Sequence, residues 1–392
     1  MGEPSVLNIL DIIGTVFKYT WWIILPLGLY SIFRPLWASY VVNILFFGGE
    51  INQTLLQIKI PKDMQASPKA MENVLAGLLA AARTITKYHN IMLGRIQDYF
   101  SFEIVGQEGD VSFYILAPAR SVRLAEKLFY SQFPDVEISV AREDYFKRLP
   151  ATIPDDNWGM WGAKVILDQE DCRPLNTYPM MEDRIAGELV DPLAIIFEAM
   201  GTLGPGEHLI YQVQASVDSG EWRKKGEEEI KKIMEKYKVG VDLTDEEGVM
   251  TKTLPPHEVD LVKAINAKMS KPAFATQILL VYVARKEVYN GIMPSTISGA
   301  LKMLDSNYNN LITDKYYSTT AYYLFAKNRR AFRSRRLFKL MQDRDIQGTA
   351  NVLNVEELAT LFHFPTPMMK VPSVPRLDSK TAPAPSNLPV AE

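Results

Sequence analysis

The sequence has 392 residues, with 43 Lys or Arg against 46 Asp or Glu, a formal net charge of −3 and a single cysteine, Cys172. This length suffices for two or three domains with hydrophobic cores, and one cysteine excludes an internal disulfide. The slightly negative charge excludes a protein that is basic throughout, so any surface that attracts phosphate must be local.

The first 50 residues are predicted to form a membrane anchor. Between residues 6 and 47 the only charged residues are Asp11, Lys18 and Arg34, and residues 19–33 carry no charge. A spanning helix needs about 20 mostly apolar residues. Aromatic residues near both ends of the stretch resemble the interfacial belts of membrane proteins, and a proline is tolerated within such a helix. The residues expected to hold the anchor are Trp21, Trp22, Pro26, Tyr30 and Trp37.

Two alternatives to an anchor are a cleaved signal peptide and a buried helix. A signal peptide should open with Lys or Arg, whereas Glu3 and Asp11 come first, and no clear cleavage site follows. Arg34, Lys59 and Lys62 follow the apolar stretch, and this modest basic excess favours a cytoplasmic body. We therefore expect a single-pass protein of the cell (inner) membrane with most of the chain in the cytoplasm.

The next hundred residues match a split βαβ unit. The expected order is a strand, a helix that opens at Ser67-Pro68, a hairpin of two strands, a second helix and a short strand. The expected ranges are residues 55–60, 67–88, 99–105, 111–116, 120–132 and 136–140. This β-α-β-β-α-β order is typical of the ferredoxin-like fold.

A similar order recurs in the second half of the chain, with a helical insertion. Strands are expected at residues 162–167, 208–217 and 275–284, and a poorly marked last strand lies between residues 310 and 324. Helices are expected at residues 191–203 and 294–304, and the insertion adds charged helices at residues 222–237 and 258–269. The repeat is one of topology rather than of sequence.

The predicted fold class is α+β. It comprises an N-terminal transmembrane helix, two ferredoxin-like (split βαβ) units, the second with the helical insertion, a basic helix and a Pro-rich tail. The predicted domains are the anchor and juxtamembrane segment (1–50), the first unit (51–150), the second unit (151–325), the basic helix with a short helical segment (326–364) and the Pro-rich tail or linker (365–392).

Motifs of known catalytic sites are missing from the sequence. It contains neither the nucleotide loop G-x-x-x-x-G-K-[ST] nor the nucleophile elbow G-x-S-x-G. The glycine-rich residues 201–206 follow a predicted helix and precede a strand, which reverses the order needed to bind phosphate. The four histidines lie far apart in the sequence. We therefore assign no catalytic, cofactor-binding or metal-ligating residue and expect no cofactor.

A run of basic residues, 327–339, interrupts the otherwise mixed charge pattern. It contains Arg329, Arg330, Arg333, Arg335 and Arg336 and no acidic residue. Three interpretations remain open: a solvated helix face, a site for anionic lipid headgroups, or a site for DNA phosphate. The lipid interpretation is favoured because the predicted anchor would already place the helix at a membrane.

Several segments together resemble a known family. They are WWIILPLGLY, LLQIKIPKDMQASPKAMENVLAGL, VSFYILAPAR, DPLAIIFEAMGTLGPGEHLIYQV, KNRRAFRSRR and NVEELATLFHFPTPMMKVPSVPRL. In this order they are similar to the N-terminal, non-ATPase region of conjugation-type (type IV secretion) ATPase proteins of candidate-phyla, Patescibacteria-like bacteria. That region is a membrane anchor followed by a domain of unknown function.

The resemblance implies a role in transport without catalysis by this chain. In such relatives a Pro-rich segment joins a motor domain, whereas this sequence carries no nucleotide loop. Either the motor ATPase is on another chain, which is the expectation here, or this copy has lost it. The expected function is a non-enzymatic, membrane-anchored scaffold or accessory component of a conjugation-like transport machine. The expected partners are the lipid bilayer and the motor, with self-association and DNA contact left open. The alternatives are a general membrane-bound adaptor and, third, an enzyme.

Overall fold

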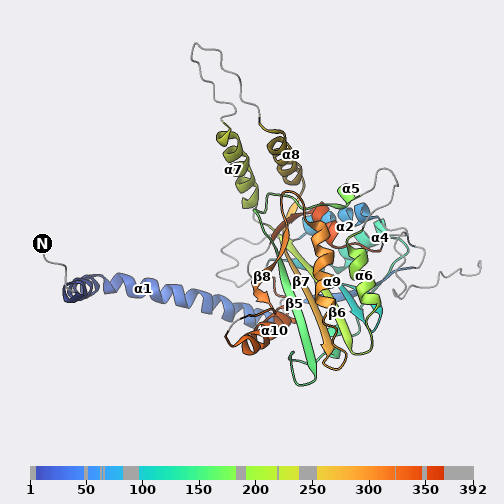
Figure 1. Ribbon diagram of the computed structural model, residues 1–392, viewed down its shortest axis with the longest axis horizontal. Coiled ribbons are helices and arrows are strands. Elements are labelled where there is room, and N and C mark those ends of the chain that lie inside the picture. The colour runs from blue at the N-terminus through green and yellow to red at the C-terminus, as the bar shows by residue number, and fades with distance from the viewer. Residues whose placement is uncertain are drawn as a thin grey trace, which may run out of the picture. The chain divides into compact units, whose positions relative to one another are not determined.

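The computed structural model has an α+β fold and describes residues 6–47, 52–61, 64, 67–82, 97–181, 191–218, 220–237, 254–322, 324–346 and 351–365 (Figure 1). The described part divides into two units. The first contains helix α1 (Val6–Phe47), and the second contains the sheet and all other described helices. The end of the helix predicted at residues 67–88 and the predicted Pro-rich tail, from residue 366 onward, lie outside the described residues.

The prediction that the segment forming helix α1 is a membrane anchor is wrong. No helix among the described residues combines the length and the hydropathy that crossing a membrane requires. Only residues 19–33 separate Lys18 from Arg34, which is shorter than the about 20 apolar residues of a spanning helix. Four of these 15 residues are Trp or Tyr, which are amphipathic rather than strongly apolar. The predicted transmembrane helix and the predicted single-pass inner-membrane location are therefore wrong.

The five predicted anchor residues all lie on α1. Trp21, Trp22, Tyr30 and Trp37 are exposed, and Pro26 lies inside the helix. The indole N–H of Trp22 donates to the carbonyl of Tyr19, and the ring of Trp37 stacks on a neighbouring ring one turn away. These side chains therefore contact their own helix.

The first half of the sheet has the strand order of a split βαβ unit. Its fourth strand pairs with the first, the first with the third, and the third with the second, all antiparallel. The strands are β1 (Gln53–Lys59), β2 (Tyr99–Gln107), β3 (Asp110–Pro118) and β4 (Glu137–Val140). Helices α2 (Pro68–Ala80) and α4 (Val122–Gln132) connect them, and Ser67 caps α2 by accepting a hydrogen bond from the amide of Lys69.

The second half repeats this strand order and continues the same sheet. Antiparallel pairing of β2 with β6 joins the two halves along their length. The strands are β5 (Trp158–Leu167), β6 (Glu207–Val217), β7 (Ala273–Arg285) and β8 (Leu311–Ser318), with the short β9 (Asn351–Asn354) added to β7. Helices α6 (Leu193–Gly201) and α9 (Met293–Leu301) are the crossovers, and α5 (Tyr178–Met181) lies between β5 and α6.

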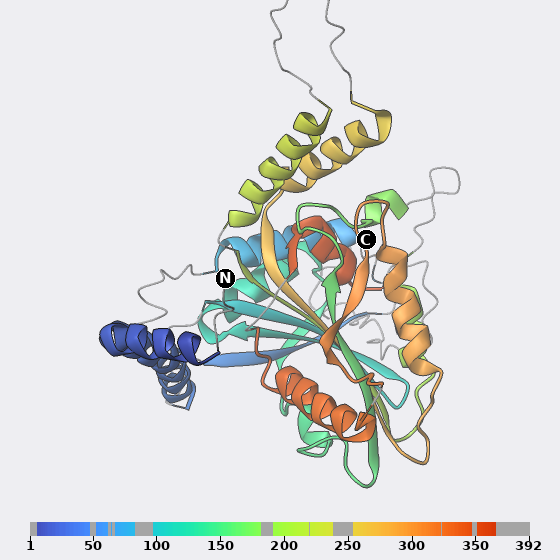
Figure 2. The ribbon, with the colours of Figure 1, turned by 60° about the vertical axis from the view of Figure 1, so that its left-hand side comes forward.

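The sheet is covered on both faces, and its strands alternate between two cores. In β7, Ile278 and Leu280 face the core under α2, α4, α6 and α9, whereas Leu279 and Val281 face the opposite core. The opposite core is covered by a short 3₁₀ helix, η2 (Tyr145–Arg148), and by helix α10 (Ala326–Gln342). Figure 2 shows α10 on one side of the sheet and α2 and α9 on the other. The sheet therefore fixes where α10 lies.

The insertion forms a helical pair next to the sheet. Helices α7 (Glu221–Lys236) and α8 (Pro256–Ser270) pack on each other through Ile233, Leu261 and Ile265. The free thiol of Cys172 is buried in this small core, and burial raises its pKa. A buried, protonated thiol of this kind packs as a small apolar side chain.

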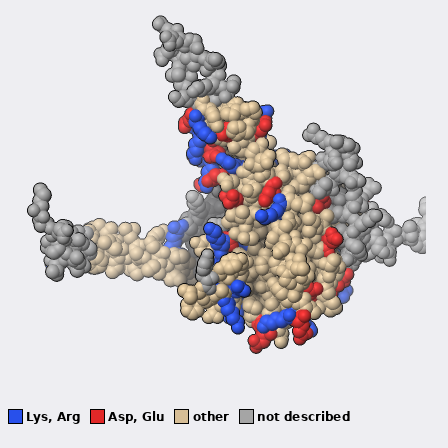
Figure 3. Space-filling model, viewed as in Figure 1, with Lys and Arg blue, Asp and Glu red and all other residues tan. Residues whose placement is uncertain are grey.

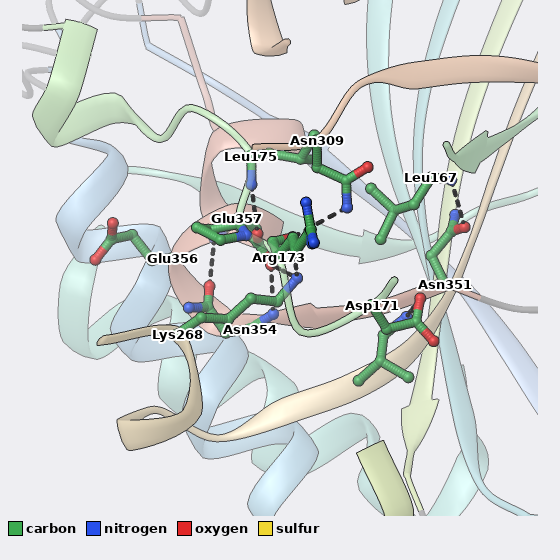
Figure 4. A network of polar contacts seen from close by, with 12 residues as sticks. Leu167, Asp171, Arg173, Leu175, Lys268, Asn309, Asn351, Asn354, Glu356 and Glu357 are labelled. Carbon is green, nitrogen blue, oxygen red and sulfur yellow. Dashed lines mark hydrogen bonds and ion pairs between the residues drawn. The ribbon is translucent and has the colours of Figure 1, made fainter. Parts of the chain in front are cut away.

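The end of the described chain is held by a buried ion pair. Helix α11 (Val355–Leu361) begins with a capping box between Asn354 and Glu357. The Glu357 carboxylate also accepts from the amide of Leu175 at 2.9 Å and pairs with Lys268 Nζ at 3.0 Å, with both side chains fully buried (Figure 4). Glu357 therefore connects α11 to α8 and to the segment after β5.

Two phenylalanines after α11 complete the core of the first half. Phe362 lies 5.2 Å from the ring of Phe102, and Phe364 lies 5.3 Å and 5.1 Å from the rings of Phe113 and Phe133. Between them His363 contacts Asp191 at 2.6 Å and the carbonyl of Ala359 at 2.8 Å. β9 pairs with β7 in the second half of the sheet, whereas Phe362 and Phe364, which follow it in the chain, pack against strands and helices of the first half.

Replacing Phe364 should test how much this segment stabilises the sheet. Because the ring is fully buried among aromatic rings, Phe364→Ala should lower the free energy of unfolding by about 3–5 kcal/mol. The control Phe332→Ala removes an exposed ring and should change it by less than about 0.5 kcal/mol. Urea unfolding followed by circular dichroism measures both values, and equal small effects would contradict the packing described.

His208 should make stability depend on pH. Burial lowers its pKa from 6.5 to about 4, with a further lowering by Arg148 and an opposing effect of Glu108. Since the folded chain binds the proton less readily, the free energy of unfolding should fall as pH drops from about 6.5 towards 4, by up to on the order of 3 kcal/mol. His208→Gln should flatten this part of a pH series of urea unfolding curves. An unchanged series would show that His208 is not responsible.

Candidate functional site

Helix α10 carries the basic run and packs on the sheet through its apolar face. Leu337, Phe338 and Met341 are buried in the core against β7 and η2. A Cβ atom at Gly162 of β5 would lie 2.8 Å from Leu337 Cδ2, so glycine at this position lets the helix approach the strand closely. The arginines lie on the remaining faces of α10, and Arg329, Arg330, Arg335 and Arg336 are exposed.

Three of the arginines are held in place by hydrogen bonds to the segment that precedes α10. Arg330 Nε donates to the carbonyl of Ala321 at 3.2 Å, and Arg333 Nη1 donates to the carbonyl of Thr320 at 2.8 Å. Arg336 Nη2 donates to the Tyr317 hydroxyl at 2.7 Å, and its guanidinium lies 4.3 Å from the centre of the Tyr317 ring. Each guanidinium has five N–H donors, so most of its donors remain for another partner.

A bulge in β8 brings aromatic side chains beside α10. β8 is an edge strand of the sheet, and residues 314–317 lie opposite Lys164 alone, because Thr313 pairs with Val165 and Ser318 with Ala163. The ring of Tyr317 is close to two cations, Arg336 and Lys164, and Lys164 Nζ is 5.2 Å from the ring centre. Bulges on edge strands commonly direct side chains towards functional sites.

Exposed aromatic rings lie on α10 and on the chain segment that leads into it. They are Tyr316, Tyr322, Phe325 and Phe332, exposed by 74%, 69%, 78% and 67%, and we name them the aromatic rim. Phe325 precedes α10 with a φ of 59°, a left-handed conformation that costs a bulky residue on the order of 1 kcal/mol. Four large exposed rings within residues 316–332 are unusual on a protein surface and indicate an interaction site.

The charge of this surface is uncompensated. Arg329, Arg330, Arg333, Arg335 and Arg336, which we name the cationic surface, form no ion pair with any carboxylate that the structure describes. Arg329 and Arg330 lie near the helix N-terminus, where the helix dipole disfavours positive charge. On the face drawn in Figure 3, Lys and Arg lie over α10, whereas α7 and α8 carry both signs of charge. Local stability therefore does not explain the arrangement.

A buried polar network fastens the end of α10 to the sheet. Arg344 follows the helix with a φ of 50° and binds the Glu103 carboxylate of β2 with Nε at 2.7 Å and Nη2 at 3.1 Å. The same guanidinium binds Asp144 at 2.6 Å, and Gln212 donates to the carbonyl of Met341 in the last turn of α10. α10 is thus positioned by its apolar face and by this network.

Glu103 is fully saturated by its neighbours. Besides Arg344, its oxygens accept from the Ser101 hydroxyl at 2.6 Å and the Tyr145 hydroxyl at 2.9 Å. Burial and the adjacent Glu103 carboxylate raise the pKa of Tyr145 well above its usual value, so Tyr145 stays protonated as a donor. With every direction occupied by a fixed donor, this carboxylate serves packing rather than proton transfer.

The structure gathers the predicted basic residues but places the predicted anchor residues elsewhere in the chain. The five arginines lie on one helix beside the aromatic rim. Sequence reasoning missed Lys164, Tyr317 and Arg344, because a lysine within a strand and a tyrosine in a bulge carry no motif. The only usable signal was the density of tyrosines between residues 316 and 323. Across the described ranges, no three His, Cys, Asp or Glu side chains come together as a metal site requires.

Comparisons with known proteins leave the family open. No protein-family model matches the sequence, and no curated protein matches it. Among solved structures, a variant of berberine bridge enzyme in complex with (S)-reticuline aligns with a TM-score of 0.24 and 10% identity. That alignment covers 82% of this chain and 55% of the other, so this chain spans about half of that enzyme. Its TM-score is too low to establish a shared fold, and no argument rests on it.

Breaking the buried network should destabilise the protein strongly. Arg344→Met leaves the Glu103 charge buried without its cation and should lower the free energy of unfolding by about 3–5 kcal/mol. The control Arg335→Met removes an exposed arginine and should change it by less than about 0.5 kcal/mol.

The double variant Glu103→Gln with Arg344→Met should recover part of the loss, since no buried charge is then left unpaired. Chemical unfolding of the three variants measures these differences. If Arg344→Met proved as mild as its control, the proposed anchoring of α10 would be wrong.

Proposed function

We propose that this chain is a non-catalytic accessory component of a conjugation-like transport machine, working with a motor ATPase on another chain. The observation that carries the proposal is the cationic surface, which has no described acidic partner and is presented on a rigidly packed helix. Such a surface is suited to bind an anionic partner. We infer the type of machine from the sequence resemblance, because the segments quoted above are similar to the non-ATPase region of conjugation-type ATPase proteins.

The buried charged groups support a structural rather than a catalytic role. Glu103 is saturated by Arg344, Tyr145 and Ser101, and Glu357 by Lys268 and two backbone amides. Catalytic acids and bases need a face that a substrate can reach. These carboxylates instead connect strands and helices that are far apart in sequence.

Co-expression with a motor tests this proposal. The full chain and the conjugation-type ATPase encoded nearest to it in the same genome should co-elute in size-exclusion chromatography, and the chain should change the ATPase rate of the motor. The chain alone should show no saturable ATP binding by calorimetry. Separate elution with an unchanged ATPase rate would contradict a role as the motor's partner, and stoichiometric ATP binding would contradict a non-catalytic one.

A further inference from the structure

We infer that the cationic surface and the aromatic rim together bind single-stranded nucleic acid, with the arginines on phosphates and the rings stacked on bases. The inference deepens the proposed function by naming the anionic partner. Two features carry it: guanidinium groups that are fixed in place yet keep free donors, and exposed rings on α10 and on the segment that leads into it. Proteins that bind single strands combine these two elements.

The arginines form a short, oriented stripe. Arg329 to Arg336 span seven positions, or about 10 Å of helix at 1.5 Å per residue. Hydrogen bonds from Arg330, Arg333 and Arg336 to residues 317–321 restrict these side chains, so less conformational entropy is lost on binding than for free arginines. An oriented guanidinium can bind phosphate through two parallel hydrogen bonds.

The aromatic rim distinguishes a single strand from a duplex. A duplex buries the faces of its bases in the stack, whereas a single strand can place them on protein rings. Phe332 lies on α10 between Arg329 and Arg333 in the sequence. Tyr322 is the residue after Ala321, whose carbonyl accepts a hydrogen bond from Arg330. Along the chain, exposed rings and arginines are therefore interleaved from Tyr322 to Arg336.

An anionic membrane is the less favoured partner. A helix that lies on a membrane inserts a broad apolar face, but the apolar face of α10 is already buried against the sheet through Leu337, Phe338 and Met341. Phe332 is the large apolar side chain that the described part of α10 leaves exposed. α10 therefore offers solvent charge and one ring, and the exposed side chains of Leu324 and Phe325 lie in the turn before it rather than on an insertable helix face.

Fluorescence anisotropy of the full chain tests the inference. The probes are a labelled oligothymidylate of about 20 nucleotides, an oligouridylate of equal length and a duplex of equal length. Single strands should bind more tightly than the duplex, and their affinity should fall between about 50 and 200 mM salt, with a slope of log K against log salt near −0.7 per phosphate contacted. The two single strands separate DNA from RNA as the physiological source.

Charge variants show which surface binds. Replacing Arg329, Arg330, Arg333, Arg335 and Arg336 by Gln should abolish binding of the single strand and flatten its salt dependence. The matched control replaces five exposed basic residues of α7, Arg223, Lys224, Lys225, Lys231 and Lys232, by Gln and should leave affinity nearly unchanged. Equal losses in both variants would show that only net charge matters and would overturn the inference.

Ring variants separate stacking from apolar contact. Phe332→Leu keeps an apolar side chain but removes the ring, so single-strand affinity should fall about 5- to 150-fold, the range measured for a lost stacked base. Phe332→Trp should retain or increase affinity, which also shows that the position tolerates substitution.

Vesicles of phosphatidylcholine and phosphatidylserine provide the competing partner. If the chain bound the vesicles, Phe332→Leu kept this binding, and neither single strand bound, the inference would be overturned in favour of a membrane. Equal affinity for duplex and single strand would overturn the role of the rings. Because every arm uses this chain alone, failure here is distinguishable from failure to bind a motor.

Discussion

The Glu103 carboxylate is buried in the middle of the sheet, and its neutralisation organises one whole face of the protein. Placing such a charge in the interior costs several kcal/mol unless a cation and further donors surround it. Arg344 supplies the cation in a bidentate contact, and Ser101, Tyr145 and Gln212 supply the remaining donors. These groups come from β2, β6, η2 and the end of α10, so the charge can be satisfied only when all four are assembled. Register and helix docking are thereby coupled.

This coupling explains how α10 can present so much positive charge. The helix gains its stability from one face, through Leu337, Phe338 and Met341, and from the network at its C-terminal end. Its outward face carries arginines that pair with no carboxylate among the described residues, and exposed rings lie on this face and on the segment before it, where Phe325 has a positive φ. Local choices that reduce stability without a structural return are expected at functional sites. The residues that reduce local stability are therefore the same residues that form the cationic surface and the aromatic rim.

The sequence predicts individual strands better than it predicts which distant segments pair or pack together. The strands expected at residues 99–105 and 208–217 lie within β2 and β6, since alternation and turn residues mark them. Pairing of β2 with β6, which makes one sheet of two units, leaves no local signal. β9 was missed because four residues are too short for a pattern. The predicted anchor was wrong because it rested on the absence of charge in residues 19–33 and on aromatic belts, whereas no described helix has the length and hydropathy that a span requires. The arginines of the cationic surface could be predicted from the basic run in the sequence. The positions of Lys164 and Tyr317 beside α10 depend on the bulge in β8, and the position of Arg344 depends on the buried network, so neither could be predicted.

Photo-crosslinking tests the central claim, that nucleic acid lies on the aromatic rim beside the cationic surface, most directly. A single strand carrying 5-iodouracil, irradiated in complex with the full chain and analysed by peptide mass spectrometry, reports which rings contact bases. The account predicts crosslinks to Phe325, Phe332 or Tyr322 that disappear when the five arginines are replaced by Gln. Crosslinks confined to α1, or to the opposite face of the sheet around α4, would contradict it.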